Sequence, residues 1–168
     1  MRRRIDRFVE DSLAEFAGWF SDAAWLGKER DFVNLFALRF LCPRAQPGAA
    51  IEEISQVRIE SPVPQPTKYD KPSAPKDLVV WKHGLETAWD ETWRAVRAPR
   101  VVMEWKVDRN YASTPEFDGH DTDWLSEFTR EYPGAVGYLV SVAYGAQENT
   151  VAWAKVAYGR VYTANRHS

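Results

Sequence analysis

The chain has 168 residues, of which 45% are hydrophobic and 27% are charged, and its formal net charge is -2. This length suits one domain with a core of its own, and the charge lacks the strongly basic balance of many nucleic-acid-binding proteins. The only cysteine is Cys42, which excludes an intramolecular disulfide and a cysteine-rich zinc site. No stretch is apolar enough for a signal peptide or a transmembrane helix, so we expect a soluble, cytoplasmic protein without membrane contact.

Apolar residues at helical spacing predict two helices near the start of the sequence. In residues 5–20 they recur every three or four positions, as in an amphipathic helix. A second helix is expected at about 28–41, where Gly27 precedes the pattern and Pro43 ends it. Both helices present an apolar stripe that must pack against another element.

The middle of the sequence is richer in strand signals. Alternation predicts a strand at 57–61, and a β-branched, apolar run predicts another at 77–82. Five prolines in 62–76 predict an extended, exposed connection between them. Apolar residues in 85–97 recur at helical spacing, so a helix is expected there.

The remaining elements complete a layered α/β pattern. In order, we expect a strand at 100–107, a helix at 121–132, a strand at 136–144 and a strand at 151–158. This succession predicts an α/β fold with a central mixed sheet flanked by helices, in a single domain over residues 1–168.

Charged residues inside an apolar strand are the strongest functional signal. Glu104 and Lys106 lie two positions apart, and strand side chains alternate, so both point to one face while Trp105 points to the other. Burying an acid and a lysine on such a strand is costly unless they pair or bind a ligand. If Asp77 begins a neighbouring strand, two carboxylates and one ammonium group converge.

Two carboxylates beside an ammonium group suit the hydrolysis of a phosphodiester bond. Divalent cations such as Mg²⁺ prefer carboxylate oxygens and keep waters and a substrate phosphate as further ligands. The cation polarises the phosphate and lowers the pKa of a bound water. Asp77 and Glu104 are therefore the expected ligands of Mg²⁺ or Mn²⁺. Lys106 is expected to orient the attacking water. Crowding of the acids should raise the pKa of at least one of them.

The segments Pro75-Lys76-Asp77 and Glu104-Trp105-Lys106 resemble the motif of the PD-(D/E)XK nuclease superfamily. The resemblance covers about residues 28–144 and implies a restriction endonuclease-like fold with a central mixed sheet flanked by helices. It implies a metal-dependent nuclease, with DNA as the expected nucleic acid. It also implies that Glu29, at the start of the second expected helix, assists as a fourth catalytic residue.

Each of these residues also has a purely structural interpretation. Glu104 and Lys106 could form a cross-strand ion pair. Asp77 could cap a turn before its strand, and Glu29 could be a first-turn acid favoured by the helix dipole. The alternative function is an inactive nuclease-like fold that serves as a nucleic-acid-binding or assembly module. DNA against RNA, endonuclease against exonuclease action and the oligomeric state, a homodimer included, stay open.

Two further groups have weaker claims to a function. His120, Asp121 and Asp123 carry metal-type donors, but Asp121 or Thr122 is more simply expected to cap the helix at 121–132. Four arginines form a loose basic group near the expected site, and they are either a solvated face or phosphate contacts. They are Arg94, Arg97, Arg100 and Arg109.

Overall fold

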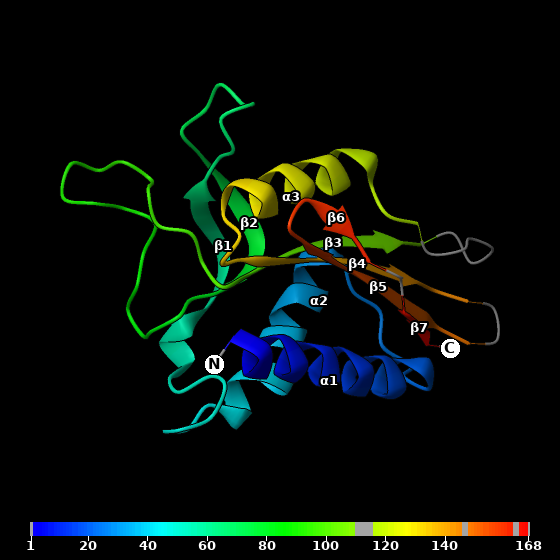
Figure 1. The fold of residues 1–168 in the computed structure, drawn as a ribbon. Coiled ribbons are helices and arrows are strands. Elements are labelled where there is room, and N and C mark those ends of the chain that lie inside the picture. Colours follow the sequence, from blue (N-terminus) through cyan, green and yellow to red (C-terminus); the bar gives the residue numbers. More distant parts are fainter. Residues whose placement is uncertain (1, 110–115, 146–147, 163–164, 168) are drawn as a thin grey trace.

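The computed structural model describes residues 2–109, 116–145, 148–162 and 165–167, and its strands form one mixed β-sheet with helices on both faces (Figure 1). The strands are β1 (Val57–Pro64), β2 (Ser73–Val80), β3 (Val101–Asp108), β4 (Val136–Ala143), β5 (Thr150–Ala157), β6 (Arg160–Val161) and β7 (Asn165–His167). They lie in the order β1-β2-β3-β4-β5-β6, and β7 pairs with β5. The expected α/β class, with a mixed sheet flanked by helices, is confirmed for the described residues.

In the described part of the chain, three α-helices cover the sheet. They are α1 (Arg2–Ser21), α2 (Glu29–Leu35) and α3 (Gly119–Glu131), with a short 3₁₀ turn at Ile54–Gln56 before β1. The chain after α2 continues as a π-helix, Phe36–Leu41, and a 3₁₀ turn, Cys42–Arg44. The helix predicted at 28–41 is therefore confirmed, but its second half is a π-helix instead of an α-helix. The helix predicted at 5–20 is also confirmed. The described part of the chain holds no helix with the length and apolar character needed to cross a membrane.

The strand pairing shows where two neighbouring strands of the sheet separate. β1, β2 and β3 are antiparallel neighbours, whereas β3 and β4 run parallel and are joined through α3, the crossover that parallel strands require. β3 pairs with β4 along its whole length. Its pairing with β2 covers three residue pairs and ends at Leu78↔Met103. Beyond this point β2 and β3 separate.

The core between the sheet and the pair α1 and α2 is built from aromatic rings. Phe16 of α1 is fully buried, and its ring centroid lies 5.5–6.2 Å from those of six other aromatic residues. They are Trp19, Phe20, Phe32, Phe36, Phe40 and Trp105. Trp105 brings β3 into this cluster, so its neighbours on the strand, Glu104 and Lys106, face the other side.

The opposite face of the sheet is covered by α3. Its buried residues Trp124, Leu125 and Phe128 form a second cluster with Val79 of β2 and Val102 of β3. The predicted helix at 121–132 is therefore confirmed, two residues earlier at its start. The predicted strands at 57–61, 77–82, 100–107, 136–144 and 151–158 are confirmed with shifted ends.

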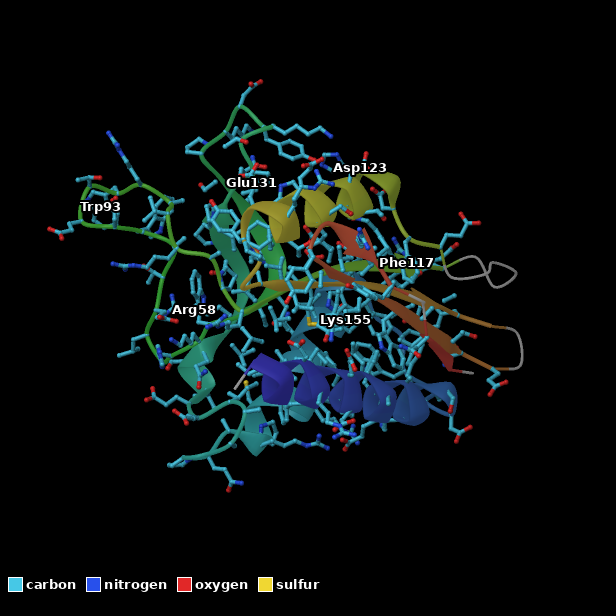
Figure 2. All side chains as sticks on the ribbon, in the orientation of Figure 1. Arg58, Trp93, Phe117, Asp123, Glu131 and Lys155 are labelled. Carbon is cyan, nitrogen blue, oxygen red and sulfur yellow. The ribbon has the colours of Figure 1, made fainter. Side chains whose placement is uncertain are left out.

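The helix predicted at 85–97 is wrong. The segment consists of turns with one isolated bridge, Trp89↔Ala95, and Trp93 lies 80% exposed on a loop that projects from the sheet (Figure 2). The side chain of Asp90 accepts hydrogen bonds from the backbone N–H groups of Thr92 and Arg94, at 2.8 and 2.9 Å. Such side-chain bonds compete with helix formation, and here they outweigh the apolar spacing.

The extended connection predicted at 62–76 is wrong as well, because these residues form most of a hairpin. β1 runs on to Pro64, β2 begins at Ser73, and Pro62 pairs with Pro75. β1 is the edge strand and β2 lacks a β3 partner at this level, and a sheet tolerates proline at such edges.

The aromatic cluster should dominate the stability of the fold. Phe16→Ala removes the ring at its centre, and we expect the free energy of unfolding to fall by about 3–5 kcal/mol. Leu38→Ala is the matched control, because Leu38 is 67% exposed in the π-helix of the same layer, and it should change the value by less than about 0.5 kcal/mol. Urea denaturation followed by circular dichroism measures both. A Phe16→Ala protein as stable as the control would contradict this description of the core.

Candidate active site

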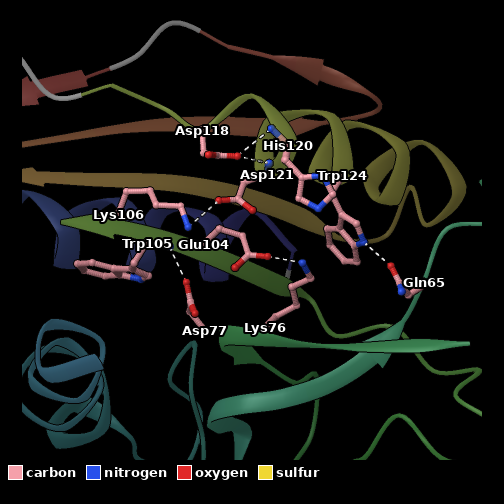
Figure 3. A network of polar contacts seen from close by, with 10 residues as sticks. All are labelled: Gln65, Lys76, Asp77, Glu104, Trp105, Lys106, Asp118, His120, Asp121 and Trp124. Atoms are coloured by element: carbon pink, nitrogen blue, oxygen red, sulfur yellow. Dashed lines mark hydrogen bonds and ion pairs between the residues drawn. The ribbon is translucent and has the colours of Figure 1, made fainter. Parts of the chain in front are cut away.

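Asp77 lies at the point where β2 and β3 separate. Its Oδ2 accepts a hydrogen bond of 2.7 Å from the backbone N–H of Trp105 (Figure 3). This bond takes the place of the strand pairing that ends one residue earlier and holds the Asp77 carboxylate next to Glu104 on β3. The structure therefore brings together the two acids that the sequence separates.

Glu104 is buried and paired with Lys76, a residue to which the sequence assigned no role. Its Oε1 forms an ion pair with Nζ of Lys76, and the two side chains are 9% and 8% exposed. The Lys76 ammonium also lies 3.7 Å from the ring centroid of Trp124 on α3. The Trp124 ring is in turn fixed by a 2.9 Å hydrogen bond from its Nε1 to Oε1 of Gln65.

Lys106 points to the same face as Glu104 but is half-exposed. Its Nζ lies 3.3 Å from Oδ2 of Asp121, in the first turn of α3. The expectation that Asp121 or Thr122 caps this helix is wrong. Asp118 is the N-cap, and its side chain accepts hydrogen bonds from the backbone N–H groups of His120 and Asp121, at 2.8 and 3.2 Å. The carboxylate of Asp121 is therefore available to hold Lys106.

Glu29 reaches the same site from the other side of the sheet. It is the first residue of α2, is partly buried, and lines a narrow recess together with Asp77 and Ile59. Burial raises the pKa of Glu29, the charge of Asp77 raises it further, and Lys106 acts in the opposite direction. The structure thus brings Glu29 close to Asp77 and Lys106. A larger cavity of about 440 Å³ opens beside Glu29 and Lys106.

The site contains more acids than cations. The acids are Glu29, Asp77, Glu104 and Asp121, and the ammonium groups are those of Lys76 and Lys106. Burial raises the pKa of Glu104 to about 7, although the ion pair with Lys76 lowers it. The charges of Asp77 and Asp121 add to the rise. The pKa of Glu104 is therefore raised mainly by burial, and the crowding of acids that the sequence predicted makes a smaller contribution.

Lys106 stays cationic at neutral pH. Partial burial by itself lowers the pKa of its ammonium group, but the carboxylates of Asp121 and Glu29 outweigh this effect, so the pKa is raised. A protonated lysine that points into a cavity can donate hydrogen bonds to a water or to a phosphate oxygen.

Asp77 and Glu104 carry the kind of oxygen ligand that hard divalent cations use. Within the described ranges, the hydrogen bonds to these acids use Oδ2 of Asp77 and Oε1 of Glu104, and the other oxygen of each carboxylate accepts none. The described residues contain no group of three or more His, Cys, Asp or Glu side chains arranged to hold a metal ion. Mg²⁺ commonly uses one or two carboxylates and completes its shell with waters and phosphate oxygens.

The four arginines do not surround this site. Arg100 precedes β3 and Arg109 follows it, so the two lie at opposite ends of an eight-residue strand. Arg97 and Arg100 line a separate cavity with Trp81, near the start of β3. The interpretation of these residues as one basic group near the site is therefore wrong.

Comparison of the chain with protein-family models, with curated proteins and with solved structures found no match.

The raised pKa of Glu104 predicts how stability depends on pH in the metal-free protein. Between its unfolded value of 4.5 and about 7, the folded protein holds a proton that the unfolded chain has released. Stability therefore falls as the pH rises through this window, and Glu104→Gln should lack this fall. Between about pH 5 and about pH 8, the free energy of unfolding of the variant should rise by up to about 3 kcal/mol relative to that of the wild type. Urea denaturation at the two pH values measures the difference.

Lys76→Met is the matched counterpart, because it removes the other half of the pair. It leaves a buried acid without its cation, which should cost about 3 kcal/mol or more at about pH 8 and less at about pH 5, where Glu104 takes up a proton. If Glu104→Gln loses as much stability as Lys76→Met at the higher pH, the pair is an ordinary structural ion pair, and the charge excess does not control this site.

Proposed function

We propose that this protein is a metal-dependent nuclease that hydrolyses the phosphodiester bonds of nucleic acid, with DNA as the expected substrate. The observation that carries the proposal is the meeting of Asp77, Glu104 and Lys106 where β2 and β3 separate. Two acids, each with an oxygen to offer, stand beside a cationic lysine, and a cavity of about 440 Å³ opens next to it. Metal-assisted phosphodiester hydrolysis can use this set of groups.

The order of the elements supports a restriction endonuclease-like fold of the PD-(D/E)XK kind. A helix with an acid at its start is followed by two antiparallel strands, and the second of these carries Asp77. The next strand carries Glu104 and Lys106, and a crossover helix then leads to the parallel strand β4. The connection between Asp77 and Glu104 is long, but it is a loop at the far end of these strands and does not enter the site.

Each residue has a distinct part in the proposed reaction. Asp77 and Glu104 would hold Mg²⁺ or Mn²⁺, which when bound supplies a polarised phosphate and a more acidic water. Lys106 donates hydrogen bonds that orient the attacking water, and Asp121 holds the lysine in place. Glu29, whose pKa is raised by burial, faces the same cavity and assists by accepting a hydrogen bond from that water.

One observation favours the alternative, an inactive nuclease-like fold that binds nucleic acid or takes part in an assembly. Lys76 already gives Glu104 a buried cationic partner. A site whose acid is satisfied within the protein can persist for structural reasons alone. Assays of cleavage and of metal binding separate the two functions.

We expect the purified protein to cleave plasmid or single-stranded DNA in the presence of Mn²⁺ or Mg²⁺. Lys106→Ala should lower the rate by about 10²-fold or more, because the group that orients the water is lost. Lys82→Ala, which removes the same charge from an exposed position outside the site, should keep the wild-type rate. Gel-based cleavage assays on both substrates measure the effect. Failure to find Lys106-dependent cleavage with either metal would favour the binding or assembly function.

Metal binding can be tested without any substrate. At a hundredfold excess of Mn²⁺ over its Kd, the wild type should gain about 2.7 kcal/mol of stability, seen as a higher Tm. Asp77→Asn and Glu104→Gln should lose this gain, and Asp22→Asn, at an exposed position outside the site, should keep it. The gain should shrink as the pH falls, because protons compete for the same oxygens. A wild-type Tm that does not respond to Mn²⁺ would contradict the metal site.

A further inference from the structure

A groove lies directly beside the candidate active site. It runs between the tip of the β1–β2 hairpin, residues 65–72, and the first turns of α3, and it has a volume of about 470 Å³. Lys76 and Trp124 line it, and the Lys76 ammonium lies between the Trp124 ring and Glu104, with which it forms an ion pair (Figure 3). The groove therefore shares Lys76 with the site, and a ligand bound in it would lie close to Glu104.

The hairpin tip is held firmly over α3. The backbone N–H of Thr67 lies 2.9 and 3.1 Å from the two carboxylate oxygens of Glu131, and its hydroxyl donates to one of them at 2.7 Å. Gln65 accepts a hydrogen bond from Trp124, and its own N–H donates to the carbonyl oxygen of Pro72 at 3.1 Å. These contacts fix both ends of the tip, so the groove is formed before any ligand binds.

The outer rim of the groove is aromatic and carries ammonium groups. The rings of Tyr69 and His120 meet edge to face, with centroids 6.2 Å apart. The Lys68 ammonium lies 5.9 Å from the Tyr69 ring centroid, and Lys71 is exposed on the same tip. Asp70 adds one carboxylate to the lining. Asp123 and Glu127 also lie close enough for their charges to act on Tyr69. These acids offset the charge of the two lysines, so the rings offer a more specific contact than the charges do.

Aromatic rings with nearby cations are the usual means of holding single-stranded nucleic acid. Each base has a flat face that can stack on a ring, while lysines contact the backbone phosphates. The bases of a continuous duplex have both faces covered by their neighbours in the stack. A base can therefore enter this narrow groove only where the strand is unpaired.

We propose that the groove binds an unpaired base beside the phosphodiester at the candidate active site, with Tyr69 as the main stacking partner. The substrate is then single-stranded DNA or an unpaired DNA end rather than a continuous duplex. This inference rests on the proposed nuclease function, which it narrows to one class of substrate.

Binding without cleavage tests the groove. Fluorescence anisotropy in EDTA and low salt, with a short labelled single-stranded DNA and the matching duplex, should show that the wild type prefers the single strand. Tyr69→Ala should weaken binding to the single strand about tenfold and leave binding to the duplex unchanged. Tyr69→Phe keeps the ring and should bind as the wild type does. Trp93→Ala removes another exposed aromatic residue, on a different loop, and should have no effect. Thermal melts of each variant establish that it is folded.

The outcomes separate this inference from the proposed function. A wild type that binds no single-stranded DNA, or prefers the duplex, overturns the inference, and so does a folded Tyr69→Ala protein with wild-type affinity. Binding that depends on Tyr69 in a protein without metal-dependent cleavage would support the groove and contradict the nuclease. Lys106-dependent cleavage with no effect of Tyr69→Ala would support the nuclease and contradict the groove.

Discussion

The candidate site depends on the early separation of β2 from β3. The two strands pair over only three residue pairs, whereas β3 pairs with β4 along its whole length. Backbone groups exposed by such a separation need other partners, and the carboxylate of Asp77 supplies one by accepting the N–H of Trp105. The same hydrogen bond fixes this acid beside Glu104. Because β4 and the aromatic core hold β3 in place, the polar residues stand on a rigid strand.

Charge balance is the second constraint on the site. An ionised acid as deeply buried as Glu104 needs a cation, and Lys76 provides it from the adjacent strand. A buried ammonium group needs partners as well, and the ring of Trp124 offers its face to Lys76. Burial nevertheless outweighs the ion pair and raises the pKa of Glu104. Four acids face two ammonium groups here, so the site has an excess of acids, which a divalent cation would offset in the proposed nuclease.

Much of the fold could be predicted from the sequence because its helices and strands carry local periodic patterns. The apolar stripes of α1 and α2 and the apolar runs of β3 and β4 are signals of this kind, as is the alternation of Glu104, Trp105 and Lys106. The segment 85–97 has a helical spacing too, but the hydrogen bonds of Asp90 form turns there. The N-cap of α3 could not be predicted either, because Asp118, Asp121 and Thr122 are all suitable cap residues and the sequence does not rank them.

The role of Lys76 could not be predicted, because it depends on an irregularity in the sheet. Leu78 and Val80 point into the core with α1 and α2, so regular alternation would send Lys76 to that side. Its ammonium group instead lies on the ring of Trp124, on the α3 side. The alternation is broken at Asp77, where the pairing with Glu60 of β1 is interrupted and Glu60 has a φ of 49°.

That irregularity also explains why a cavity and a groove of different character lie on either side of the Lys76–Glu104 ion pair. On one side lies the cavity lined by Glu29 and Lys106, and on the other lies the groove walled by Lys76 and Trp124. With regular alternation Lys76 would face the aromatic core, and the groove would lack the wall that joins it to the site. In the proposed nuclease, a bound DNA strand that ran from the groove to the cavity would pass over Glu104 and Lys106. The break in β2 thus puts Lys76, which lines the groove, on the same face of the sheet as Glu104.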